Sequence, residues 1–154
     1  MEPSLLEDAH SGDVVAIAPG RDARPGGKRS RDDVLVRARR PADECPFCAG
    51  REAQTPPASL ELPWRVRAVP NRYPALPDDA GRQEVIVHGG VHALRLAELP
   101  PPLLGDIGEA WSARIRALRA DGVPWVVPLV NEGAASGSSL DHSHSQVIAT
   151  VDPP

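Results

Sequence analysis

Aromatic residues, cysteines and long apolar segments are all scarce in this chain. Its 154 residues include three Trp, one Tyr, one Phe and two Cys. No apolar run approaches the roughly 20 residues of a membrane-spanning helix, and the first residues lack the basic and apolar regions of a signal peptide. Two cysteines are too few for a disulfide scaffold, which suits a reducing compartment. The sequence therefore predicts a cytoplasmic protein with no membrane partner.

An excess of basic charge is missing as well. Lys and Arg number 17 against 21 Asp and Glu, giving a net charge of −4. Nucleic-acid-binding proteins normally carry a strong basic excess, so we expect no nucleic-acid partner. The apolar share of 41% and the charged share of 25% are those of a globular chain of one domain. With 18 prolines and 13 glycines, much of the chain is expected to be turn and irregular structure.

Short apolar segments separated by turn residues predict strands. Alternating or β-branched residues mark these segments at 13–19, 33–36, 64–69, 84–87, 125–130 and 146–151. Pro128 indicates that the segment at 125–130 lies at a sheet edge or a bulge, because proline cannot donate to a ladder. The polar, proline-rich stretch at 49–63 is predicted to be a loop.

One helix is predicted after the prolines at 100–102. Asp121 and Gly122 end it. Its apolar residues recur at spacings of three and four and form one stripe, made of Leu104, Ile107, Trp111, Ile115 and Leu118. Strands outnumber helices, so the pattern predicts an α+β fold in which one long helix packs on a sheet.

The densest group of reactive side chains lies at residues 140–146, just ahead of the last predicted strand. In an extended chain His142, His144 and Gln146 share one face, because side chains alternate with period two. This arrangement suits a metal, a phosphate or nucleophilic attack on phosphorus; the alternative is a polar surface strand. A serine-hydrolase triad is excluded, because Asp141 adjoins His142 and points to the opposite face.

The cysteine pair, Cys45 and Cys48, has three interpretations. A redox pair would need the N-terminus of a helix after a strand, which this proline-rich setting does not offer. Half of a tetrahedral zinc site would need two further ligands, which only histidines can supply here. Two buried thiols without a ligand are the third interpretation, since one such pair is a weak signal. We favour the zinc site.

Two further segments could bind phosphate. The small residues at 131–139 would let backbone amides approach an anion, although no Gly-Lys-Ser/Thr follows as in a P-loop; a flexible linker is the alternative. The loop at 20–31 carries five basic residues that could hold phosphates or could simply be solvated: Arg21, Arg24, Lys28, Arg29 and Arg31.

Taken together, these segments resemble the galactose-1-phosphate uridylyltransferase family of the histidine triad superfamily. The likeness runs in the family's order along nearly the whole chain, at residues 17–25, 45–48, 69–76, 84–92, 131–137 and 142–146. It implies a histidine-triad-like fold, a mostly antiparallel sheet with one long packed helix. Residues 1–154 would be the family's N-terminal, nucleophile-bearing half, with the C-terminal half absent.

The resemblance also assigns roles to individual residues. Cys45, Cys48, His92 and His142 would bind a structural Zn²⁺, and His144 would be the nucleophile. Ser139 and Gln146 would assist catalysis at the phosphates. The residues that would contact the nucleotide and its phosphates are Arg21, Arg24, Asn71, Asn131, Ser139 and Gln146.

The implied reaction moves a nucleoside monophosphate, UMP by the family's specificity, between a nucleotide-sugar and a hexose 1-phosphate through a covalent nucleotidyl-histidine. UDP-glucose and ADP-glucose are the expected donors, the setting is hexose metabolism, and a homodimer is expected. The family usually carries His-Pro-His-Gly-Gln, whereas residues 142–146 read His-Ser-His-Ser-Gln. This variant resembles ADP-glucose phosphorylase-type nucleotidyltransferases. The alternatives are such a phosphorylase, a histidine triad nucleotide hydrolase, and a zinc-stabilised nucleotide-binding module without turnover.

Overall fold

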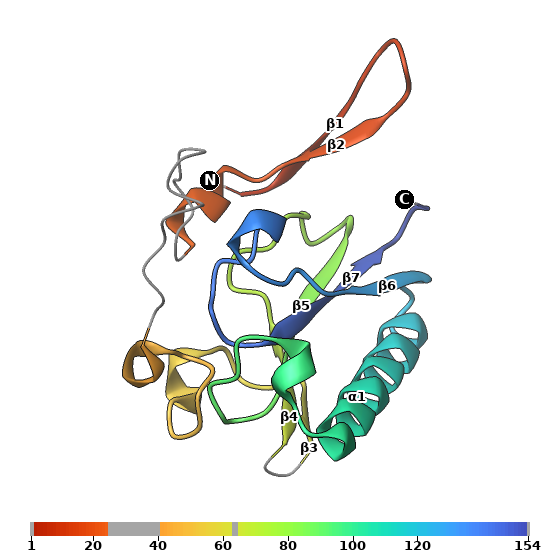
Figure 1. Cartoon of the computed structure of the whole chain (residues 1–154). Coiled ribbons are helices and arrows are strands. Elements are labelled where there is room, and N and C mark those ends of the chain that lie inside the picture. The colour runs from red at the N-terminus through yellow and green to blue at the C-terminus, as the bar shows by residue number, and fades with distance from the viewer. Residues whose placement is uncertain (1, 25–40, 63–64, 154) are drawn as a thin grey trace.

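The computed structural model describes residues 2–24, 41–62 and 65–153, and it centres on one antiparallel sheet with a helix on one face (Figure 1). The sheet order is β3-β4-β5-β7-β6. Its strands are β3 (Leu60–Leu62), β4 (Val66–Pro70), β5 (Gly81–Val87), β6 (Trp125–Leu129) and β7 (His144–Thr150). The long helix is α1 (Pro101–Ala120), and a separate hairpin pairs β1 (Ser4–Glu7) with β2 (Val14–Ile17). Short 3-10 turns are η1 (Pro19–Ala23), η2 (Ala42–Glu44), η3 (Glu52–Gln54), η4 (Leu96–Glu98) and η5 (Ala134–Ser136).

The two faces of the sheet have different coverings, because successive side chains of a strand point to opposite sides. One face packs against α1 and forms the larger apolar core, which includes Val66, Ala68, Ile86, Val147 and Ala149. The other face carries a smaller cluster made of Cys45, Phe47, Cys48, Val69, Val85, Val87 and Leu140. Residues of β4, β5 and β7 that point away from the helix therefore face the loops that hold the cysteines.

Helix α1 ends where the sequence predicts, but it begins at Pro101 and not after Pro102. Pro101 stands in its first turn, and Gly122, at φ +87°, follows its last residues. The predicted stripe is wrong at Leu104, whose side chain is 40% exposed, while the neighbouring Leu103 packs against the core. Periodicity gives the spacing of a helical stripe, but the angle at which the helix lies on the sheet decides which of two adjacent leucines is covered.

Most predicted strands are present, but several bounds and one assignment differ. Strand β5 begins at Gly81, three residues earlier than predicted. Residues 49–63 are not entirely loop, because β3 lies within them and forms one edge of the sheet. The last strand begins at His144, two residues earlier than predicted, and the hairpin strand β1 was not predicted at all. The edge position inferred from Pro128 is confirmed, since β6 forms the other edge. The strand predicted at 33–36 lies outside the described residues.

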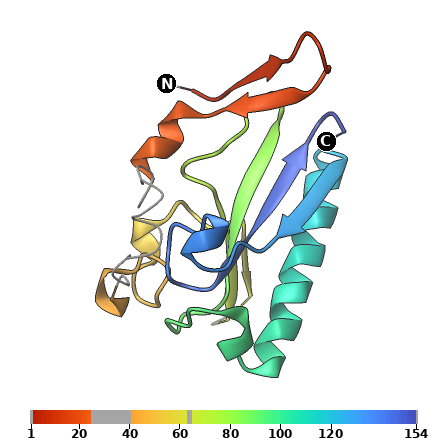
Figure 2. The same ribbon diagram turned by 45° about the horizontal axis from the view of Figure 1, so that its top comes forward.

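Both views place the β1–β2 hairpin outside the sheet and helix (Figures 1 and 2). Figure 2 also shows α1 running along one side of the sheet, leaving the opposite side to the loop at 41–59 and to η5. Across the described ranges, no helix is both long and apolar enough to cross a membrane.

Candidate metal centre and active site

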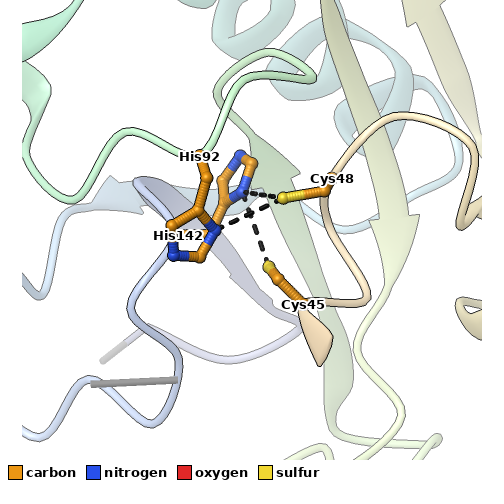
Figure 3. Close-up of side chains that lie close together, drawn as sticks. All are labelled: Cys45, Cys48, His92 and His142. Atoms are coloured by element: carbon orange, nitrogen blue, oxygen red, sulfur yellow. Dashed lines mark hydrogen bonds between the residues drawn. The ribbon is translucent and has the colours of Figure 1, made fainter. Parts of the chain in front are cut away.

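Four predicted metal ligands converge from three distant segments of the chain (Figure 3). Cys45 and Cys48 lie in the turn after η2, His92 follows β5, and His142 comes just before β7. Their ligand atoms all lie within 4.8 Å of one another. The fold therefore brings together the two cysteines and two histidines that could hold a metal ion.

The distances between these ligand atoms fit a tetrahedral site. The Nδ1 atom of His142 lies 3.6 Å from the Sγ of Cys45 and 3.7 Å from the Sγ of Cys48. The Nδ1 of His92 lies 3.3 Å from the Sγ of Cys48. Tetrahedral zinc with ordinary Zn–S and Zn–N bonds would place sulfur and nitrogen about 3.5 Å apart. The residues present therefore match a thiolate–imidazole metal site within a few tenths of an ångström.

Main-chain contacts hold His142 in the state that a metal requires. Its Nε2–H donates to the Gly89 carbonyl at 3.0 Å, which leaves the Nδ1 lone pair directed at the cysteines. Burial lowers the pKa of His142 to about 4, so the ring is neutral near pH 7. The turn that supplies the carbonyl needs glycine, because Gly89 has φ +91° and a Cβ on Gly90 would lie 2.9 Å from the Ala49 Cβ.

The raised pKa of Cys48 argues against a redox role. Burial, with the neighbouring Cys45, raises the pKa of the Cys48 thiol to about 11. Redox-active Cys-x-x-Cys pairs instead have a lowered pKa, since the thiolate is the reacting form. A bound metal ion would displace these protons and hold both sulfurs as thiolates.

His144, the first residue of β7, is held in one orientation by the backbone. Its Nδ1–H donates to the His142 carbonyl at 2.7 Å, so its Nε2 keeps the lone pair. Burial lowers the pKa of His144, opposed by that hydrogen bond, and the ring is neutral near pH 7. The Phe47 ring contacts both imidazoles, with centroids 5.9 Å from His142 and 5.5 Å from His144. The two histidines therefore lie close together, with Nδ1 of His142 turned to the cysteines and Nδ1 of His144 turned to the backbone.

A cavity of about 740 Å³ lies on the face of the sheet opposite α1. None of the four residues that could hold a metal ion lines it. The cavity is lined by every residue that the sequence assigned to substrate or catalysis: Arg21, Arg24, Asn71, Asn131, Ser139, His144 and Gln146.

Two arginines from η1 and the residue after it bring positive charge to this cavity. The Nη1 of Arg21 donates to the Tyr73 carbonyl at 2.6 Å, and the Oδ1 of Asn71 accepts from the Tyr73 N–H at 2.9 Å. Burial lowers the pKa of Arg21, and the charge of Arg24 lowers it further. Two partly desolvated cations of like sign favour an anion between them. The other basic residues of this loop, Lys28, Arg29 and Arg31, lie outside the described residues.

The loop at 131–139 is ordered by its own hydrogen bonds. This order argues against the alternative interpretation as a flexible linker. The Nδ2 of Asn131 donates to the Ser136 carbonyl at 3.0 Å, and the Ser136 hydroxyl donates to the Glu132 carbonyl at 2.7 Å. Gly133 and Gly137 take φ values of +80° and +85° that favour glycine. The loop thus holds Asn131 and Ser139 at the cavity wall.

Comparison with known proteins identifies the family. Residues 65–154 match the family model described as galactose-1-phosphate uridyl transferase, N-terminal domain. This chain belongs to the galactose-1-phosphate uridylyltransferase family.

Relatives of this uridylyltransferase-family chain include two kinds of nucleotidyltransferase. The ADP-glucose phosphorylase of Arabidopsis thaliana is 30% identical over 99% of this chain and 50% of its own length. A galactose-1-phosphate uridylyltransferase of Streptomyces lividans is 35% identical over 71% of this chain and 30% of its own length. The chain thus spans half or less of the length of these curated relatives.

Solved structures confirm the histidine-triad-like fold. The crystal structure of the Arabidopsis ADP-glucose phosphorylase with bound ADP-glucose superposes with a TM-score of 0.68 at 29% identity, covering 100% of this chain and 50% of that one. A histidine triad nucleotide-binding protein from Candida albicans superposes with a TM-score of 0.57 at 22% identity over 71% of this chain and 76% of its own, a likeness of fold alone. The α+β prediction is therefore confirmed.

A buried network explains the two serines of this family member's His-Ser-His-Ser-Gln segment. His88 is fully buried between them, with Nδ1 2.9 Å from the Ser143 hydroxyl and Nε2 2.9 Å from the Ser145 hydroxyl. Trp111 of α1 donates its Nε1–H to Ser145 at 2.8 Å. Burial, with smaller contributions from His144 and His142, lowers the pKa of His88 to about 3. The neutral His88 ring, with both nitrogens hydrogen-bonded, thus fixes the positions of Ser143 and Ser145.

The sequence prediction missed three residues of this uridylyltransferase-family site. They are His88, Gln83, whose amide donates to Gln146, and Gly89, which holds His142. Two signals were available. Period-two alternation along 81–87 places Gln83 on the same face as Val85, and the Gly-Gly pair after His88 marks a close backbone approach. Neither signal predicts the hydrogen-bond partners of these residues, which lie more than 50 residues away along the chain.

Proposed function

We propose that this chain carries out nucleotidyl transfer through a covalent nucleotidyl-histidine on His144. The observation that carries the proposal is the 2.7 Å bond from His144 Nδ1–H to the His142 carbonyl, because it leaves Nε2 unprotonated in an arginine-lined cavity. In the first step Nε2 attacks the α-phosphorus of a nucleotide-sugar. A P–N bond forms, and the P–O bond to the sugar phosphate breaks and releases hexose 1-phosphate.

In the second step the phosphate oxygen of an acceptor attacks the same phosphorus. A P–O bond forms, the P–N bond breaks, and His144 recovers its neutral state with Nδ1–H still bonded to the backbone. A hexose 1-phosphate is the proposed acceptor. Charge that builds on the phosphoryl oxygens is met by Arg21, Arg24, Ser139 and the Gln146 amide, all of which line the cavity.

The metal in this proposal is zinc, held by Cys45, Cys48, His92 and His142. Zinc would supply structural cross-linking of the two loops and the segment before β7, because four protein ligands leave no position for substrate. The separation of these ligands from the cavity wall supports that assignment.

Two nucleotides are candidates for the transferred group. UMP is the specificity that the family's name implies. AMP is favoured by the match to the Arabidopsis ADP-glucose phosphorylase along 99% of the chain, whereas the match to the Streptomyces uridylyltransferase covers 71%. The homodimer expected from the resemblance remains a prediction.

Incubation with UDP-glucose and ADP-glucose, each labelled at the α-phosphorus, tests the proposal. We expect acid-labile label on the protein, its loss in His144→Gly, and its retention in His10→Gly, a matched change at an exposed histidine in the β1–β2 turn. Release of free mononucleotide would indicate a histidine triad hydrolase, and binding without label would indicate a non-catalytic module. Undiminished label in His144→Gly would refute the assignment.

A further inference from the structure

Gln83 and Gln146 lie on adjacent strands, on the face of the sheet that borders the cavity. Val85 of β5 pairs with Gln146 of β7, so Gln83, two residues earlier on β5, is its diagonal neighbour on the same face. The side chain of Gln83 is only 7% exposed. A buried primary amide with two donors and an acceptor must find partners for both ends.

The partners of Gln83 define which way its amide points. Its Oε1 accepts from the backbone N–H of Ala75 at 2.8 Å. A backbone N–H can only donate, so the oxygen of Gln83 must face Ala75 and its Nε2 must face the other way. That Nε2 donates to the Oε1 of Gln146.

The same reasoning carries over to Gln146. Since its Oε1 is already the acceptor of the Gln83 donor, its own Nε2 is the other end of the amide, in a side chain that lines the cavity. The Ala75 N–H thus fixes the orientation of the Gln83 amide, and Gln83 in turn fixes the orientation of the Gln146 amide.

We propose that Gln83 is a positioning residue that fixes the Gln146 amide with its N–H donors toward the phosphates. The proposal rests on the proposed function in that the anion is a nucleotide phosphate. In the opposite orientation Gln146 would present its carbonyl oxygen, which repels phosphoryl oxygens. One buried glutamine therefore decides whether Gln146 stabilises or opposes the reacting group.

Gln83→Glu reverses the direction of the hydrogen bond between residues 83 and 146 with almost no change in side-chain size. A carboxylate still accepts from Ala75, but it cannot donate to Gln146 and instead accepts from it. The Gln146 amide should then turn and direct its oxygen into the cavity. We expect adduct formation to slow by about 10²–10³-fold, the effect of removing an oxyanion donor. Gln83→Met, which removes the partner without reversing it, should have a smaller effect.

A double-mutant cycle separates this reversal from general effects of a new charge. In a Gln146→Ala background Gln83→Glu should cause little further loss, because no amide remains to turn. Repulsion of phosphate by the carboxylate itself would persist in that background and would overturn the proposal. Gln83→Met should keep the metal content of the unaltered chain and remain folded at the assay temperature, which keeps the test valid if Gln83→Glu folds poorly.

Binding of ADP and UDP provides a second readout. If the unaltered chain forms no adduct, the proposed function fails, but the same cycle can be measured as dissociation constants. We expect Gln83→Glu to weaken binding at least 10-fold only where Gln146 is present. Equal affinity and equal adduct rate in Gln83→Glu and the unaltered chain would overturn the inference while leaving the His144 mechanism intact.

Discussion

Buried His88 should make the stability of this protein depend on pH in a specific window. The folded state holds His88 neutral, with a pKa lowered to about 3 by burial, while an unfolded histidine has a pKa near 6.5. Below about pH 6.5 the unfolded chain therefore binds a proton that the folded chain does not. The stability contributed by neutral His88 is present above that pH and is lost as the pH falls toward 3.

The expected loss can be worked out at pH 5. There the folded ring remains neutral, so the loss depends only on the 1.5 units between pH 5 and the unfolded pKa. This difference corresponds to about 2 kcal/mol in the free energy of unfolding relative to pH 7. In a domain of this size that equals a fall in melting temperature of about 4–8 °C.

Chemical denaturation of the unaltered chain and of His88→Gln, each at pH 7 and pH 5, measures this effect. Glutamine does not titrate and can still bond Ser143 and Ser145. The drop between the two pH values should be smaller by about 2 kcal/mol in the variant. Acid release of metal is common to both proteins and cancels in the comparison. An equal drop in both would refute the neutral, buried state of His88.

Three further outcomes are expected. His92→Ala removes one of four metal ligands, so zinc per chain and melting temperature should both fall; elemental analysis showing full zinc retention would contradict the site. Replacing Arg21 and Arg24 by alanine should weaken nucleotide-sugar affinity and flatten its salt dependence without changing zinc content. The control Arg116→Ala, on the exposed side of α1, should leave the affinity unchanged. Unaltered affinity in the double variant would mean that the basic loop is merely solvated. Gln146→Ala should slow adduct formation by about 10²–10³-fold in a normally folded protein, and a normal rate would exclude it as a donor.

The local elements of this protein could be predicted from its sequence because their signals are short-range. The stripe from Ile107 to Leu118 and the Gly122 stop define α1, and alternation or β-branching defines β4, β5 and β7. Both periods are properties of the backbone itself. Strands β1 and β3 carried weak signals, since β1 is exposed and β3 has three residues in a proline-rich segment, so only their pairing reveals them.

The residues of the site could be chosen from the sequence, but not their geometry. The resemblance separated His142 from His144, whereas alternation alone put both on one face. Their different environments depend on two hydrogen bonds to the backbone. His142 bonds the carbonyl of Gly89, which is 53 positions away in the chain, and His144 bonds the carbonyl of His142. A spacing of two can place side chains on a face, but it does not say what covers that face.

Only the tertiary structure decided which groups support the histidines. The register of β5 against β7 puts Gln83 beside Gln146 and His88 beside Ser143 and Ser145, across 55 to 63 residues of chain. Shifting that register by one residue would turn Gln83 to the helix side and break the hydrogen bonds that Gln83 and His88 make to β7 and the segment before it. The sequence by itself determined the long helix, most of the strands, the cysteine pair and the histidine strand, because those signals are local. Strand register, amide orientation and ring tautomer follow from long-range pairing, which no local pattern records.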